Sequence, residues 1–67
     1  MQLIAKSEFC RKRNCPKLFR DKDGEFYIQG YVIADPGKMV SGLPTDETLV
    51  RIDASLLRQI KEAGISF

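Results

Sequence analysis

The sequence contains no histidine, only two cysteines and no long run of apolar residues. Histidine is the side chain that most often acts as a general base near neutral pH. The short motifs of serine hydrolases, phosphate-binding loops and dinucleotide-binding sites are missing as well. We therefore expect a protein that is not an enzyme and that carries no cofactor.

The apolar runs are only a few residues long, whereas a membrane-spanning helix needs about 20 apolar residues. Residues 1–6 are too short and too polar for a secretory signal. Small secreted scaffolds usually carry more than two cysteines. These absences predict a cytoplasmic protein without a membrane segment.

The 67 residues, 43% hydrophobic and 30% charged, are typical of one small globular domain. We expect a single domain over residues 1–67, in which residues 1–15 form a basic loop or arm. A chain this short buries only about 60% of the surface that it exposes when unfolded. Partners, metals or disulfides therefore often stabilise domains of this size.

Charge is unevenly distributed along the chain. Residues 6–22 hold seven basic and two acidic side chains, a net charge of +5, whereas residues 23–67 hold four basic and seven acidic side chains, a net charge of −3. The molecule is therefore expected to be an electrical dipole with a basic N-terminal third.

Local patterns predict an α+β fold, in which a small antiparallel sheet of two to three strands is covered by a C-terminal helix. The expected elements are a strand or loose arm (2–5), a strand (17–20), a glycine turn (21–24), a strand (25–33) and a strand (48–52). Asp35-Pro36 favours a short helical turn through residue 40, with a plain turn between strands as the alternative. Gly30 indicates a bulge or a close backbone approach within the long strand.

Alternation along the long strand predicts which side chains face the core. It places Phe26, Ile28 and Val32 inward, and it places Tyr27, Gln29, Tyr31 and Ile33 on the other face. In the strand over residues 48–52, Val50 and Ile52 are expected to face inward.

The C-terminal helix has the clearest pattern. Asp53 is a good N-cap, and Gly64 stands where a helix often ends in a left-handed residue, which would fold Ile65 back onto Ile60. The expected inward face is formed by Leu56, Leu57, Ile60 and Ala63.

The two cysteines, Cys10 and Cys15, leave several interpretations open. A structural zinc site needs four ligands, usually in two pairs, so one chain would add only carboxylates and a second copy would add another pair of thiolates. A disulfide is sterically feasible but disfavoured in the cytosol. The simplest interpretation is a buried Cys15 that acts as a small hydrophobic residue and an ordinary Cys10. We expect no metal, with these two residues as the weak candidates for one.

A basic cluster surrounds the cysteines. It attracts phosphate backbones through counterion release, and nearby aromatic side chains can stack on single-stranded bases. The same charges would also suit an acidic protein surface, or simply solvent. The candidate binding residues are Arg11, Lys12, Arg13, Lys17, Arg20, Tyr27 and Tyr31.

Several short motifs occur in an order that resembles a group of short uncharacterised actinobacterial accessory proteins encoded beside helix-turn-helix regulators. The motifs are residues 15–19, Asp23-Gly24, residues 28–33, Asp35-Pro36, Leu43-Pro44 and residues 47–52. The similarity covers most of residues 14–62 and does not include the basic triplet. It implies a role in transcriptional regulation or in a toxin–antitoxin-like pair, through protein–protein contact, and it names no catalytic residue.

The leading hypothesis is a small regulatory protein–protein interaction module, either a homodimer or the partner of a transcriptional regulator. The alternative is direct nucleic-acid binding through the basic N-terminal third.

Overall fold

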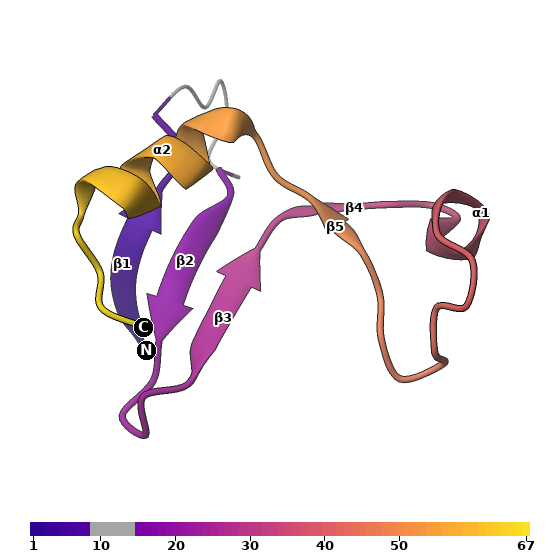
Figure 1. Ribbon diagram of the computed structural model, residues 1–67, viewed down its shortest axis with the longest axis horizontal. Helices are drawn as coiled ribbons and strands as arrows, with labels where there is room; N and C mark the ends of the chain where they lie inside the picture. The colour runs from indigo at the N-terminus through magenta and orange to yellow at the C-terminus, as the bar shows by residue number, and fades with distance from the viewer. Residues whose placement is uncertain (9–14) are drawn as a thin grey trace.

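A computed structural model describes residues 1–8 and 15–67 of the chain. It is an α+β structure with a three-stranded antiparallel sheet, a separate two-stranded sheet and a C-terminal helix (Figure 1). The elements are β1 (Gln2–Lys6), β2 (Lys17–Arg20), β3 (Phe26–Gln29), β4 (Tyr31–Val32), α1 (Pro36–Met39), β5 (Val50–Arg51) and α2 (Ala54–Glu62). The predicted fold class is confirmed, and the second sheet is an addition to it.

The three-stranded sheet has the order β1-β2-β3, and its strands pair antiparallel. The strand over residues 17–20 and the turn after it were both predicted. Asp21 Oδ1 accepts hydrogen bonds from the backbone N–H groups of Asp23 and Glu25, and Gly24 takes the positive φ (85°) that the reversal needs. Residues 2–6 form an edge strand, which is the strand of the two alternatives expected for residues 2–5.

Gly30 divides the predicted strand over residues 25–33 into two strands that belong to different sheets. A Cβ atom at Gly30 would lie 2.8 Å from the Arg51 carbonyl oxygen, which is the close backbone approach that the sequence indicates. Because the strand breaks here, Phe26 and Val32 do not share a face. Phe26 packs against the core, whereas Val32 is 92% exposed, and the expectation of an inward Val32 is wrong.

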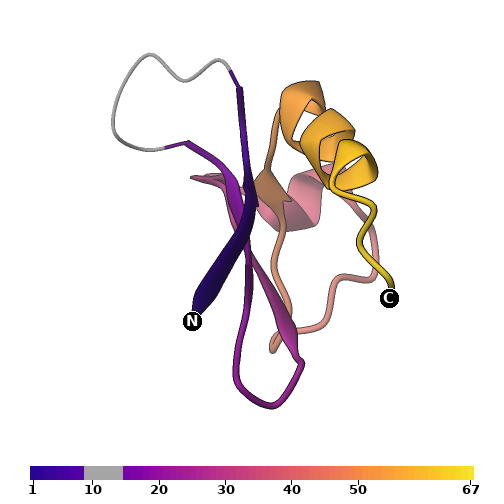
Figure 2. The same cartoon turned by 90° about the vertical axis from the view of Figure 1, so that its left-hand side faces the viewer.

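Helix α2 lies over β1 and β2 on one side of the three-stranded sheet (Figures 1 and 2). Asp53 caps it as predicted, since its Oδ1 accepts a hydrogen bond from the Leu56 N–H at 3.1 Å. Gly64 has a positive φ of 64° just beyond the last helical turn. Leu56 is fully buried as expected, but Leu57 is 56% exposed, so the predicted inward face was too wide.

The hydrophobic core between α2 and the sheet is small. Its buried members are Ala5, Leu18 and Leu56, and the partly buried side chains packed against them are Ile4, Phe26, Ile52, Ile60 and Ile65. The chain beyond α2 returns along the same side, where the Phe67 ring lies 5.2 Å from the Phe26 ring. A core of this size stabilises the three-stranded sheet and α2.

Residues 31–51 project sideways from the three-stranded sheet (Figure 1), and this segment is called the arm below. The arm contains β4, β5 and the short helical turn α1, which was predicted; β5 is shorter than the expected strand. No residue from 19 to 54 is buried. The radius of gyration of 13.2 Å exceeds the roughly 11 Å typical of a compact domain of this length, because the arm extends from the core.

Candidate functional site

One face of the three-stranded sheet is not covered by α2. Cross-strand pairing aligns Leu3, Phe19 and Tyr27 in one row, and paired residues point to the same side of a sheet. Ala5 and Leu18, paired in the neighbouring row, are buried in the core with Leu56 of α2, so the first row points to the opposite side. Leu3 is 49% exposed and Tyr27 is 44% exposed, and Figure 2 shows α2 confined to the other side. We call this side of the sheet the open face.

The open face carries opposite charges at its two ends. Lys6 pairs with Lys17, which is two residues from Phe19 along β2, so both ammonium groups belong to this face. At the other end, Asp21 directly follows Arg20 and Glu25 directly precedes Phe26, and both Arg20 and Phe26 point toward α2; the Asp21 N–H donates to the Glu25 carbonyl across the turn at 3.0 Å. Alternation therefore places both carboxylates on the open face. The sequence predicted a dipole between the two parts of the chain, but not this gradient across one sheet.

Asp21 and Tyr27 interact on this face. The Tyr27 hydroxyl donates a hydrogen bond of 2.8 Å to Asp21 Oδ2. This bond, with the backbone N–H groups of the turn, lowers the pKa of the Asp21 carboxyl, and the same carboxylate raises the pKa of the Tyr27 phenol. The bond holds the phenol against the acidic end, leaving the ring available for contact.

The arm is the second candidate surface. Its exposed apolar side chains include Val32, Met39, Val40 and Val50. The Arg51 guanidinium lies 4.6 Å from the centre of the Tyr31 ring, so this cation–π contact stiffens the ribbon where it leaves the sheet. The expectation that Tyr27 and Tyr31 share a strand face is wrong, because Tyr31 belongs to the two-stranded sheet.

The basic candidates do not form one cluster among the described residues. Lys17 points to the open face, whereas Arg20, three residues further along the same strand, lies on the α2 side with its guanidinium 5.4 Å from the Phe26 ring. Arg11, Lys12 and Arg13 lie outside the described residues, as does Cys10. The structure therefore brings Lys17 together with Lys6, which sequence reasoning did not select.

Cys15 is buried, as expected, with 5% of its surface exposed. Its sulfur is in a disulfide, so the interpretation of Cys15 as a free thiol is wrong. Within residues 1–8 and 15–67, no group of three or more histidine, cysteine, aspartate or glutamate side chains is arranged to hold a metal ion.

A buried polar cluster joins β1 to α2. Asp53 Oδ1 accepts hydrogen bonds from the hydroxyls of Ser55 (2.6 Å) and Ser7 (2.8 Å), and the Ser55 hydroxyl accepts one from the Glu8 N–H. These donors lower the pKa of the Asp53 carboxyl, chiefly through Ser55 and then Ser7. The helix cap was predicted from Asp53, but the two serines were not, because no local pattern places Ser7 beside α2.

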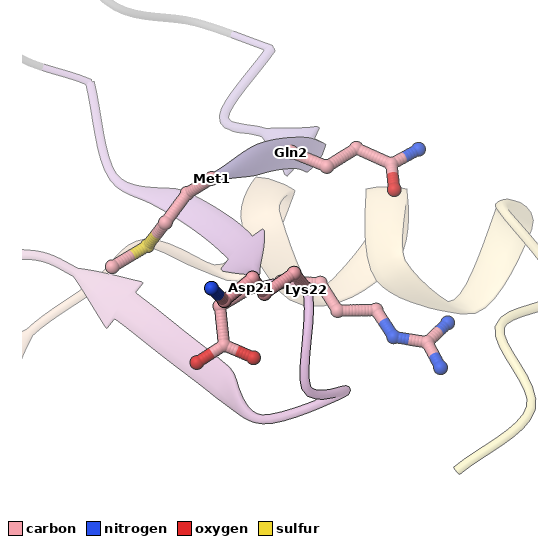
Figure 3. Close-up of a pocket in the computed structure, with 5 residues that line it drawn as sticks. Met1, Gln2, Asp21 and Lys22 are labelled. Atoms are coloured by element: carbon pink, nitrogen blue, oxygen red, sulfur yellow. The ribbon is translucent and has the colours of Figure 1, made fainter.

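A shallow depression of about 350 Å³ lies at the start of β1, lined by Met1, Gln2, Arg20, Asp21 and Lys22 (Figure 3). Figure 3 shows the Asp21 carboxylate pointing away from Met1 and Gln2. It points instead toward its partners in the turn. The carboxylate among the lining residues is therefore already engaged by the turn and by Tyr27.

Comparison of the chain with family models, curated proteins and solved structures finds no match. Among the described helices, none combines the length and apolar character required to cross a membrane.

Proposed function

We propose that this protein is a small interaction module that regulates another protein by binding to it, without a catalytic step. The observation that supports this most directly is the arm. It presents a chain of exposed apolar side chains with no core of its own, and two-residue strands are too short to be stable as an isolated ribbon. A partner that covers Val32 and Met39 would bury apolar surface and stabilise the arm.

The partner class that we favour is a transcriptional regulator, because the resemblance found in the sequence is to proteins encoded beside such regulators. The arm suits this role physically. It extends from the domain (Figure 1), so it can reach a groove on another protein while the three-stranded sheet remains outside.

The proposal is tested by capture from the native cell with matched variants. Immobilised wild-type protein is compared with Val32→Ser/Met39→Ser, both changes on the arm, and with Leu57→Ser, a change at an exposed apolar residue on α2. We expect one protein to be retained by the wild type and by Leu57→Ser and lost with the arm variant. Equal retention by all three variants would contradict a role for the arm.

Direct nucleic-acid binding is the alternative function. Lys17 shares the open face with Phe19 and Tyr27, a combination that can hold a phosphate and stack bases. Asp21 and Glu25 at the other end of the face repel phosphate, which favours the protein-binding proposal. A gel-shift series with single-stranded DNA at low salt, comparing wild type with Lys17→Ala, tests the alternative.

A cytoplasmic location remains part of the proposal. The disulfide at Cys15 argues against this location, because such bonds persist mainly in oxidising compartments. Fractionation of the native cell checks the location: recovery of the protein in the cytoplasmic fraction supports the proposal, and recovery outside that fraction contradicts it.

A further inference from the structure

The open face combines an apolar centre with charges that can pair with themselves. Leu3, Phe19 and Tyr27 form the centre, with Lys6 and Lys17 at one end and Asp21 and Glu25 at the other. The turn over residues 21–25 holds three acidic side chains and one basic one, a net charge of −2, and the two lysines give +2 at the opposite end. The two ends therefore match in size and differ in sign.

We infer that the open face is the site where a second copy of this chain binds, with its strands reversed. In a two-fold dimer the same patch faces itself. If the two-fold axis runs along the row of Phe19, perpendicular to the strands, the lysine end of one copy faces the acidic end of the other. If the axis runs parallel to the strands, like charges meet, and this arrangement is repelled.

The reversed arrangement brings specific groups together. Lys17 of one copy then faces Asp21 of the second copy and lies diagonally from its Glu25. Sheets that pack face to face are about 10 Å apart, a gap that the stem of a lysine and the rings of Phe19 and Tyr27 can fill. By symmetry each such contact occurs twice.

The size of the face sets the strength of the association. Three strands at about 4.8 Å spacing, each contributing about five residues at 3.3 Å, cover roughly 14 by 16 Å. This is well below the roughly 800 Å² per partner of a standard interface. The dimer is accordingly weak, dissociates on dilution and is sensitive to salt, because its exposed charge pairs are screened.

A negatively charged partner fits the open face less well than a second copy of the chain does. A nucleic-acid strand would meet phosphate repulsion at Asp21 and Glu25, and an acidic protein would meet the same obstacle. A second copy of the chain satisfies both ends at once. The inference rests on the proposed function only in that both require protein–protein contact, since the arm and the open face use different residues.

Charge reversal on the full chain tests the inference. Sedimentation velocity over about 10 µM to 1 mM is compared for wild type, Lys17→Glu, Glu25→Lys and the double variant Lys17→Glu/Glu25→Lys. Within residues 1–8 and 15–67, neither side chain takes part in a hydrogen bond or ion pair, so folding should be unaffected, which far-UV circular dichroism checks. We expect each single variant to weaken association about fivefold to twentyfold, because each change acts twice in the dimer. The double variant should recover most of the wild-type association.

Two further variants locate the interface. Leu3→Gln, at the exposed centre of the face, should abolish association, whereas Val32→Gln on the arm should leave it unchanged.

A wild type that stays monomeric at 1 mM, or a dimer that is indifferent to the charge reversals, would overturn the inference. Binding of single-stranded DNA that Lys17→Glu removes, with no self-association, would assign the face to nucleic acid instead. A wild type that does not self-associate but keeps arm-dependent capture would sink this inference alone and leave the proposed function standing.

Discussion

Replacing Leu56 with alanine tests the position of the small core. Leu56 is fully buried between α2 and the three-stranded sheet. Truncation of a buried leucine to alanine costs about 2–5 kcal/mol of stability. A domain of 67 residues has a total unfolding free energy of only about 3–10 kcal/mol, at roughly 0.05–0.15 kcal/mol per residue. The single substitution therefore removes a large part of the stability of the fold.

Thermal unfolding followed by far-UV circular dichroism measures the effect. Each 1 kcal/mol shifts the midpoint by about 4–8 °C in a domain of this size, so Leu56→Ala should lower it by at least about 8 °C. The matched control is Leu57→Ala on the same helix, where the side chain is exposed and the change should stay within about 0.5 kcal/mol. Equal shifts in the two variants would refute the orientation of α2 on which the open face depends.

Three further predictions concern single interactions. The folded-state pKa of Asp53 is lowered, so the stability that its carboxylate contributes is present above the ordinary aspartate pKa of about 3.9 and is lost as pH falls below that value. The melting midpoint of Asp53→Asn should therefore depend less on pH in this acid range than that of the wild type. Gly30→Ala would force a Cβ against backbone and should speed amide exchange in β4 and β5, whereas Gly37→Ala, with nothing within 4 Å of the added carbon, should not. The pKa of Tyr27 is raised by its bond to Asp21, so Asp21→Asn should shift part of the phenol absorbance titration to lower pH.

Local chemistry explains why much of the main sheet was predictable. The strand over residues 17–20 ends at a turn whose aspartate and glycine act within a few residues of one another. Helix α2 has its cap in Asp53 and its left-handed Gly64 within one continuous segment. In both cases the residues that determine the structure are close together in the chain, so the pattern of one short stretch predicts it.

The predictions from the sequence were wrong where contacts between distant segments determine the structure. Residues 25–33 read as one strand, but contact of Gly30 with β5, about 20 residues later, divides it. Leu57 follows Leu56 on a helix that covers only β1 and β2, so the buried stripe is narrow and one leucine is left in solvent. The link from Ser7 to Asp53 likewise spans 46 residues. Gly30 itself signals a close approach, but no local pattern identifies β5, β1 or Ser7 as the distant partner.

The same distinction explains why the open face had to be found in the structure. Lys6, Lys17 and Phe19 are brought to one side of the sheet by the register between β1 and β2, in which an irregularity between Leu3 and Ala5 alters the alternation. A uniform alternation along β1 would place Lys6 opposite Leu3, with α2. Because the extra residue returns Lys6 to the side of Lys17, the two ammonium groups reinforce each other at one end of the face. The charge gradient is therefore a property of strand pairing, and the arrangement of a second copy follows from it only once the register is known.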